Sequence, residues 1–420
     1  MPHTARTTSR TTSRADVVTA AAVVVLTVAV TFLVVRDGTA VWQVLRGACV
    51  VALGTSLWLL ALPLQSFGRG AIACAVGLVG FAVGLGIGLP HLAKTGMTMV
   101  TVAGLACMVA GAWLIVAGAR AMLRGRRWWV AAPSIAGLLV LVGLASLTLG
   151  QAVAATNVPA TSVGQATPTQ VGVDYRDVTM TAADGVSLAA WYLPSTNGAA
   201  VVLRHGAGST RSDVLEQAAV LARHGYGVLM MDARGHGLSE GVAMDFGWYG
   251  DVDISAGVDF LAAQPEVDAE RIGAVGLSMG GEEVIGAAAS DPRIRAVIAE
   301  GATARTPQDK AWMPRVYGLA GSIQQQIDNV TYSVADALTS ASPPTSLRSA
   351  VADAAPRPTL LIVGGAVDDE SHAARSIQSG SPTTVSVWVV EGAPHVAGLA
   401  TQAQEWQERV TSFLDRPLDS

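Results

Sequence analysis

A serine stands between two glycines at residues 276–280, in the order Gly-Leu-Ser-Met-Gly. The apolar run 271–278 predicts a strand, and the residues from Gly280 onward predict a helix. A serine at such a strand-to-helix turn is exposed on a strained backbone, and the flanking glycines remove the collisions that side chains would cause there. The start of a helix also favours negative charge developing nearby. Ser278 is therefore a candidate nucleophile.

A serine hydroxyl becomes a good nucleophile when a base takes its proton and a carboxylate orients that base. His395 follows the apolar run 385–392 and is the predicted base. Asp368 follows the run 359–365 and is the predicted acid. The chain order of nucleophile, acid and base is that of one known arrangement. Three other acids remain alternatives for the carboxylate: Asp369, Glu370 and Glu300.

A glycine-rich stretch, RHGAGSTRSD at residues 204–213, follows an earlier predicted strand. Such a loop can aim a backbone N–H at a substrate oxygen. The N–H groups of Ala207 and Met279 are the predicted donors of an oxyanion hole. An ordinary glycine turn that caps a helix is compatible with the same residues.

Short apolar runs alternate with helical stretches from Val171 onward, which predicts a mainly parallel sheet covered by helices on both faces. Sites in such sheets lie at the carboxyl ends of the strands, and each motif above follows a predicted strand. The predicted strands are 199–205, 225–232, 271–278, 294–301, 359–365 and 385–392.

Residues 171–420 resemble the α/β-hydrolases of the serine-esterase and serine-peptidase-like kind. The resemblance rests on HGAG at 205–208, MDARGHGLSEG at 231–241, GLSMGG at 276–281 and the late Asp and His. It implies Ser278 as nucleophile, His395 as base, and Ala207 and Met279 as oxyanion donors. It also implies a structural turn at 232–237. The family's G-x-x-D pattern ends at Asp368, but the second aspartate leaves the register of the acid open by one residue.

Residues 303–350 fall between two core strands, where such enzymes carry a lid, and a small helical lid is expected there. Trp312 and Tyr317 either line an apolar substrate site or pack within the lid. Glu282 and Glu283 stand in the first turn after the nucleophile, where acids complement the helix dipole. The alternative is that Glu283 faces the pocket and selects polar or cationic substrates.

The first part of the chain, residues 1–153, predicts a bundle of about five transmembrane helices. We expect Pro90 to end the third span early. Gly80, Gly84 and Gly88 recur on one helix face, which either permits close helix approach or reflects glycine-rich composition. No acid lies within a span, so we expect a membrane anchor rather than an ion path. Residues 154–170 predict a linker. The predicted spans are 17–35, 47–67, 70–93, 95–119 and 128 to about 153.

Charge divides the chain in the same way. Residues 1–170 hold eleven basic residues and two acids, whereas the remainder is acidic, which argues against nucleic-acid binding. Eight of the eleven basic residues fall on one side of the predicted spans, so the N-terminus is expected in the cytoplasm. Five crossings then place residues 171–420 outside the cell membrane. The rarity of Lys and the abundance of Ala, Val, Gly and Arg suggest a bacterial source.

All three cysteines lie in the apolar part, at Cys49, Cys74 and Cys107. The rest of the chain can therefore carry no disulfide, no cysteine nucleophile and no cysteine-bound metal. Neither a metal nor a cofactor is expected. The sequence predicts a membrane-anchored serine hydrolase that cleaves carboxylic esters, with small-molecule or lipid esters of the cell envelope as substrates. The alternatives are a serine peptidase-like hydrolase and a non-catalytic membrane scaffold with a degenerate hydrolase domain.

Overall fold

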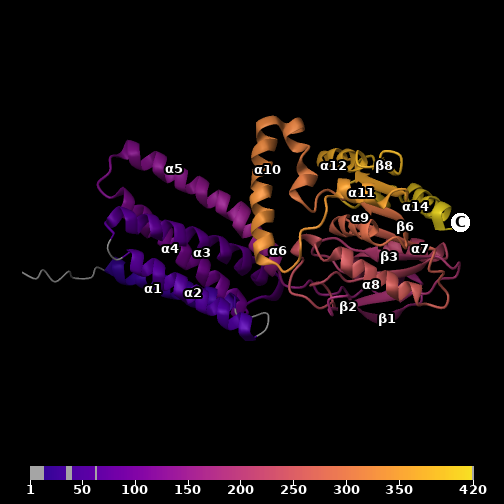
Figure 1. Cartoon of the computed structure of the whole chain (residues 1–420), viewed down its shortest axis with the longest axis horizontal. Helices are drawn as coiled ribbons and strands as arrows, with labels where there is room; N and C mark the ends of the chain where they lie inside the picture. The colour runs from indigo at the N-terminus through magenta and orange to yellow at the C-terminus, as the bar shows by residue number, and fades with distance from the viewer. Residues whose placement is uncertain (1–13, 35–39, 62–63, 419–420) are drawn as a thin grey trace, which may run out of the picture. The chain divides into compact units, whose positions relative to one another are not determined.

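A computed structural model of the chain describes residues 14–34, 40–61 and 64–418 (Figure 1). The chain divides into two compact units, Met1–Ala154 and Ala155–Ser420. The predicted membrane orientation depends partly on the basic residues at positions 6, 10 and 36. These three residues lie outside the described part of the chain.

Among the described residues of the first unit, five helices are long and apolar enough to cross a membrane, and their most apolar stretches have mean hydropathies of 1.8 to 2.7. The last one bends through a short π-helical turn, Ser146–Gly150, and continues as α6 (Gln151–Asn157). The helices are α1 (Arg14–Val34), α2 (Ala40–Ala61), α3 (Ser66–Thr95), α4 (Met99–Leu123) and α5 (Trp128–Ala145).

Helices α3 and α4 approach so closely that side chains would not fit between them. A Cβ on Gly84 would lie 2.2 Å from the Met108 backbone nitrogen, and a Cβ on Gly104 would lie 2.6 Å from the Gly88 nitrogen. The glycine repeat therefore serves close helix packing. The expected early end of the third span at Pro90 is wrong, because α3 continues to Thr95. A proline removes only one intrahelical hydrogen bond, and a packed apolar helix can continue past it.

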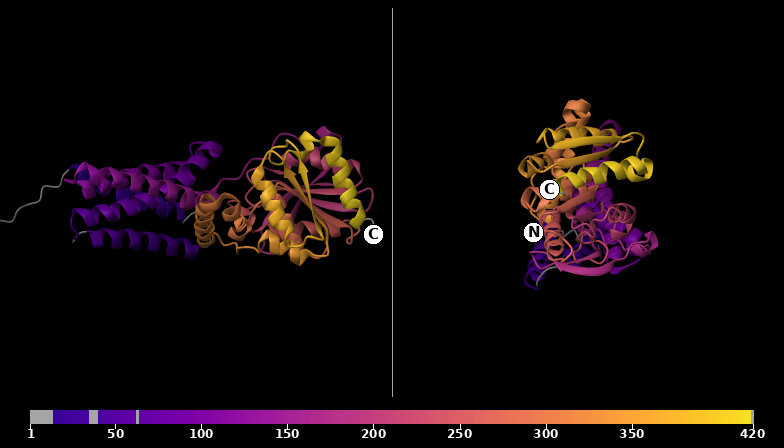
Figure 2. Two further views of the ribbon diagram at one scale, coloured as in Figure 1. Left: turned by 90° about the horizontal axis from the view of Figure 1, so that it is seen from above. Right: turned by 90° about the vertical axis from the view of Figure 1, so that its right-hand side faces the viewer.

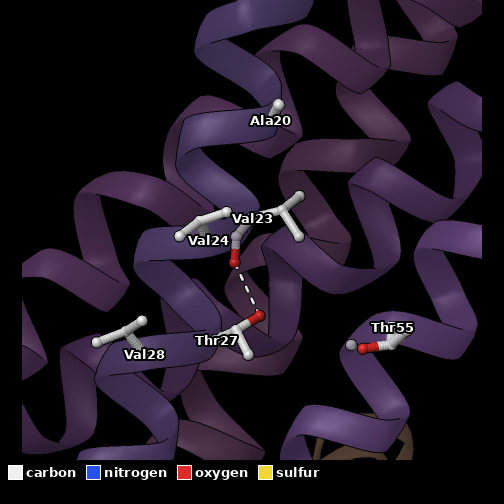
Figure 3. A pocket seen from close by; sticks show the side chains of 7 residues that line it. Ala20, Val23, Val24, Thr27, Val28 and Thr55 are labelled. Carbon is white, nitrogen blue, oxygen red and sulfur yellow. Dashed lines mark hydrogen bonds between the residues drawn. The ribbon is translucent and has the colours of Figure 1, made fainter.

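Helices α1 and α2 leave an apolar groove between them (Figure 3). Two hydroxyl groups line it, and both are engaged within their own helices: Thr27 Oγ1 donates to the Val23 carbonyl and Thr55 Oγ1 to the Val51 carbonyl, each at 2.8 Å. The groove therefore offers apolar surface and no poised polar group.

The second unit is built on a single eight-stranded sheet (Figure 2). The strand order is β1-β2-β4-β3-β5-β6-β7-β8; β2 pairs antiparallel with both β1 and β4, and all the other neighbouring strands pair in parallel. The mainly parallel sheet predicted from the alternating pattern is confirmed. The strands are β1 (Arg176–Thr181), β2 (Ser187–Leu193), β3 (Ala200–Arg204), β4 (Gly227–Met231), β5 (Ile272–Leu277), β6 (Ile294–Glu300), β7 (Thr359–Gly364) and β8 (Val385–Val390).

Helices cover both faces of this sheet. Alternate residues of the central strands point to opposite faces, and the side chains on each face are buried in a separate apolar core. Val202 of β3 joins one apolar core with α8, α9, α11 and α12, whereas Val201 and Leu203 join a second core with α7 and α14. The sheet is therefore doubly wound. The helices are α7 (Leu215–Arg223), α8 (Gly250–Ala262), α9 (Met279–Ser290), α10 (Met313–Leu338), α11 (Leu347–Ala354), α12 (Asp368–Gln378), α13 (Gly398–Thr401) and α14 (Ala403–Leu418).

The insertion at residues 303–350 is helical, as expected. A 3₁₀ turn, Pro307–Lys310, leads into the long helix α10, which is kinked at Gly318 with φ 58° and ψ −127°. Only glycine adopts such a backbone readily, so the glycine at position 318 permits the kink.

Candidate active site

Ser278 sits at a sharp elbow between β5 and α9, with φ 54° and ψ −122°. A Cβ on Gly276 would lie 2.1 Å from the Gly280 carbonyl oxygen, and a Cβ on Gly280 would lie 2.5 Å from the His205 carbonyl oxygen. The two glycines are therefore required by the turn, for the reason that the sequence predicted. A positive φ at a non-glycine residue is strained, and the surrounding hydrogen bonds hold it: the Ser278 N–H donates to the Glu300 carbonyl at 2.7 Å.

His395 lies in the loop after β8, and its Nε2 is 2.9 Å from Ser278 Oγ. Gly301, at the end of β6, leaves room for the imidazole, since a Cβ there would lie 2.9 Å from His395 Cε1. The His395 side chain keeps 46% of its surface exposed. The predicted pair of serine and histidine is thus brought together from segments 117 residues apart.

The acid that contacts His395 is Glu370, with its Oε1 2.6 Å from His395 Nδ1. The expectation that Asp368 partners His395 is wrong. Asp368 is the exposed first residue of α12, whereas Glu370 points inward with its side chain 1% exposed. Glu370 shares its helix face with the buried residues Ala373, Ala374 and Ile377. That spacing of i, i+3, i+4 and i+7 is the signal in the sequence that could have identified it.

The two other alternative acids have different partners. Asp369 accepts a hydrogen bond from the Tyr317 hydroxyl at 2.5 Å. Glu300 accepts hydrogen bonds from the Gly398 N–H at 2.7 Å and from Trp406 Nε1 at 2.9 Å. Glu300 therefore anchors the segment just after His395 rather than the imidazole itself.

The hydrogen bonds around His395 define its protonation. The Glu370 carboxylate accepts from Nδ1–H, which leaves Nε2 free to accept the Ser278 hydroxyl proton. The hydrogen bond to Glu370 raises the pKa of His395 above its ordinary value of 6.5, although partial burial opposes the rise. The first turn of α12 also suits a carboxylate, because the helix dipole is positive there.

The loop after β3 lies against the elbow, since a Cβ on Gly206 would be 3.0 Å from Ser278 Cβ. Two buried histidines fix this loop. His205 accepts from the Ala233 N–H at 2.8 Å, so its Nδ1–H donates to the Gly206 carbonyl at 2.8 Å. His236 Nε2 accepts from the Gly208 N–H at 3.1 Å. Burial lowers the pKa of His205 well below its ordinary value, which keeps it neutral for this role.

Two backbone N–H groups beside Ser278 remain available. Within the described part of the chain, the Ala207 N–H donates no hydrogen bond. Met279 is the first residue of α9, and such a residue has no carbonyl one turn back in its helix. Ala207 follows Gly206, which lies against Ser278, and Met279 follows Ser278 directly, so both N–H groups stay predicted oxyanion donors.

Glu283 does not face a pocket, so its proposed contact with substrate is wrong. Its side chain is 3% exposed and forms a hydrogen-bonded ion pair with Arg204 Nε at the end of β3. Asp253 lies 3.5 Å from Arg204 and 2.7 Å from Arg234, which extends a buried charge network beneath the elbow. Burial raises the pKa of Glu283 to about 7, although Arg204 opposes the rise. The ion pair with Arg204 stabilises the charged Glu283 carboxylate in this buried position.

Glu282 is also buried, and it ties the elbow helix to the insertion. Its Oε1 accepts from the Thr303 N–H at 3.0 Å and from the Ala304 N–H at 2.8 Å. Burial raises the pKa of Glu282 to about 7. The two glutamates are thus internal structural acids as well as residues of a helix N-terminus.

Trp312 and Tyr317 lie at the start of α10 and contact the first turns of α12. Trp312 stacks on His372 with ring centroids 5.3 Å apart, and Tyr317 donates to Asp369. These contacts fasten the insertion to the helix that presents Glu370. No cluster of three or more His, Cys, Asp or Glu suited to a metal ion occurs among the described residues.

Comparisons with known proteins relate parts of this chain to hydrolases. The sequence model of the family described as serine aminopeptidase, S33, matches residues 195–364. A thiohydrolase of Aspergillus aculeatus is 35% identical over 133 residues, which cover 30% of this chain and 40% of that protein. An uncharacterized protein of Mycobacterium tuberculosis is 34% identical over 126 residues, which cover 29% and 44%. The chain thus spans less than half the length of these relatives.

A solved structure covers more of the chain. An esterase of Pyrococcus furiosus is 26% identical, with a TM-score of 0.50, and the similarity covers 63% of this chain and 98% of the esterase. The unmatched part of this chain is about the size of its first unit.

Proposed function

We propose that the second unit of this chain is an α/β-hydrolase domain and that the protein is a serine hydrolase that cleaves carboxylic esters. The observation that carries the proposal is the hydrogen-bonded array of Ser278, His395 and Glu370, with distances of 2.9 Å and 2.6 Å between the three side chains. An array of this geometry activates a serine hydroxyl.

The reaction begins when Ser278 Oγ attacks the ester carbonyl and its proton passes to His395 Nε2. Glu370 stabilises the imidazolium that forms and holds the ring in its orientation. The Ala207 and Met279 N–H groups donate to the oxygen that becomes negatively charged, and two such donors can lower the barrier by several kcal/mol. His395 then gives its proton to the departing alcohol. Water, activated by the same histidine, releases the acid from Ser278.

An ester is the substrate class that this domain supports best. One solved structure that is similar to it over 98% of its own length is an esterase. Peptide bonds are the second candidate, favoured by the aminopeptidase description of the matching family. Trp312 and Tyr317, at the start of the insertion, are the side chains that we propose to border the acyl group, with the insertion acting as a lid. Cell-envelope lipids or other acyl esters are the proposed natural substrates.

We also propose that the first unit anchors the protein in a bacterial cell membrane through five spans. Support comes from five helices of sufficient length and hydropathy and from the uneven distribution of basic residues between the two sides. With the N-terminus in the cytoplasm, the hydrolase domain lies on the outer face. Lipid is then the partner of the first unit, and esters near the membrane surface are within reach of the second.

The test is turnover by purified full-length protein. We expect hydrolysis of p-nitrophenyl esters of short and medium acyl chains, little or no cleavage of aminoacyl anilides, and loss of activity in Ser278→Ala. Acyl thioesters form a third arm, since one relative is a thiohydrolase. Cleavage of anilides in preference to esters would favour the peptidase, and Ser278-independent turnover would exclude the proposed mechanism.

A further inference from the structure

The sequence predicts a linker at residues 154–170, but residues 158–167, which we call the strap, bond to the loops beside the elbow. Thr161 Oγ1 donates to the Gly208 carbonyl at 3.0 Å, and the Thr161 carbonyl accepts from the Gly237 N–H at 2.9 Å. Further along, the Gly164 N–H donates to Ser212 Oγ at 2.9 Å. These contacts lie within the second unit, which begins at Ala155.

The strap is also packed. Val163 and Ala166 are partly buried against the core that contains α7 and α14. Gly164 lies so close to Ser212 that a Cβ there would be 2.7 Å from the serine oxygen. Small side chains thus allow the backbone to lie against the domain. Their composition resembles that of a flexible linker, which is why the sequence alone suggested one.

The bond from Thr161 completes a set of restraints on one short turn. His205 holds the Gly206 carbonyl, His236 holds the Gly208 N–H, and Thr161 holds the Gly208 carbonyl. Ala207 lies between the two glycines. Glycine loses more conformational freedom on folding than any other residue, so a turn with two of them needs external restraints to stay in one geometry.

We propose that Thr161 is a positioning residue for the oxyanion hole: through the Gly208 carbonyl, it keeps the Ala207 N–H aimed at the reacting oxygen. The inference rests on the proposed function, because it needs an acyl-transfer reaction at Ser278. The proposed action of Thr161 runs through the Gly208 carbonyl rather than through the substrate. Its action belongs to the transition state, where oxyanion donors contribute, rather than to substrate binding.

The experiment compares three variants in full-length protein. Thr161→Val removes the hydroxyl donor and keeps the shape, Thr161→Ser restores a donor, and Ser162→Ala is the matched control at an exposed neighbour. Loss of a whole oxyanion donor costs 10²–10³ in kcat, so we expect misplacement of one to lower kcat by about tenfold. We expect KM to stay within about twofold, with Thr161→Ser and Ser162→Ala near wild type.

A second readout separates positioning from general damage. An alkylboronic acid forms a tetrahedral adduct on an activated serine, and its affinity should fall by the same factor as kcat in Thr161→Val, with an unchanged melting temperature. If kcat of Thr161→Val equals that of wild type while Ser278→Ala is inactive, the inference is wrong and the proposed function stands. A loss that Thr161→Ser does not restore also overturns it. Full activity of Ser278→Ala would instead refute the proposed function.

Discussion

Glu370 is held at both of its carboxylate oxygens. One accepts from His395, and the other accepts from the Gly364 N–H at 2.8 Å. A carboxylate fixed in this way has one orientation, which it imposes on the imidazole. Asp368, two residues earlier, is exposed and lies on a different side of the same helix turn. Mutation of Glu370 is therefore expected to lower kcat strongly, whereas mutation of Asp368 is expected to change it little.

Glu370→Gln is expected to lower kcat by about 10³–10⁴, because an amide cannot stabilise the imidazolium and favours the wrong tautomer of the histidine. Asp368→Asn is the matched control and should leave kcat within about threefold of wild type. Steady-state ester hydrolysis by both variants measures this. A large loss in Asp368→Asn together with a small loss in Glu370→Gln would reassign the acid.

The pH dependence follows from the pKa of His395. The imidazole acts as a base only when it is neutral, and its pKa is raised above 6.5 by Glu370, with smaller contributions from Glu282 and Glu300. We therefore expect kcat/KM to rise with pH through an apparent pKa above 6.5. The residual activity of Glu370→Gln should show this limb at lower pH, because the stabilising carboxylate is gone. A wild-type limb below 6.5 would contradict the assignment.

At the scale of elements, the elbow depends on the contact between the end of β5 and the start of α9. Gly276 and Gly273 are both buried in β5, but they differ in what a side chain would meet. At Gly276 it would meet backbone at 2.1 Å, whereas at Gly273 it would meet the ends of the Leu414 and Leu418 side chains at 3.3 Å and 3.4 Å. Side-chain ends can move, and this backbone cannot.

Gly276→Ala is expected to destabilise the protein by about 3 kcal/mol or more and to abolish activity, because the elbow must rearrange. Gly273→Ala, three residues earlier on the same strand, should cost about 1 kcal/mol and retain activity. Thermal unfolding and ester hydrolysis measure both effects. Equal stability of the two variants would show that the elbow has room for a side chain.

Glu283 gives a further test of how α9 is joined to β3. Glu283→Gln leaves the buried Arg204 without one of its two carboxylate partners, and breaking a buried ion pair costs about 3 kcal/mol. We expect a lower melting temperature and an unchanged KM for cationic and neutral esters alike. A selective rise in KM for cationic esters would revive a role in substrate recognition.

The elements themselves could be predicted, but several side-chain directions could not. Alternation of apolar runs marked all the parallel strands, and the glycines around Ser278 marked the elbow. The acid was ambiguous because Asp368, Asp369 and Glu370 are consecutive, and only the helix face decides among them. The partner of Glu283, Arg204, lies 79 residues away, so local patterns carry no information about that pair. The strap has the small, polar composition of a linker, and its bonding partners at Gly208, Ser212 and Gly237 lie tens of residues away in the sequence.

At the scale of the whole molecule, the chain joins an apolar helical unit to an acidic unit built on a doubly wound, mainly parallel sheet. The two parts differ in charge, hydropathy and cysteine content, so the amino-acid sequence alone distinguishes them. The orientation of the domain relative to a membrane depends on an odd number of crossings and on the basic residues of the first unit.

Protease treatment of intact bacterial cells tests this orientation. We expect a tag after the last residue to be removed from intact cells, because the five crossings that we propose would place the second unit outside. A cytoplasmic protein should stay intact in the same sample as the control for cell lysis. Protection of the tag until the cells are opened would mean an even number of crossings.

The central claim is that His395 and Glu370 activate Ser278, and covalent labelling tests it most directly. Full-length protein is treated with a fluorophosphonate, and the modified residue is located by peptide mass spectrometry. We expect one adduct, on Ser278, whose second-order rate constant falls by about 10³ or more in His395→Ala and in Glu370→Gln but not in Asp368→Asn. An adduct on another residue, or labelling of Ser278 at the same rate in His395→Ala, would contradict it.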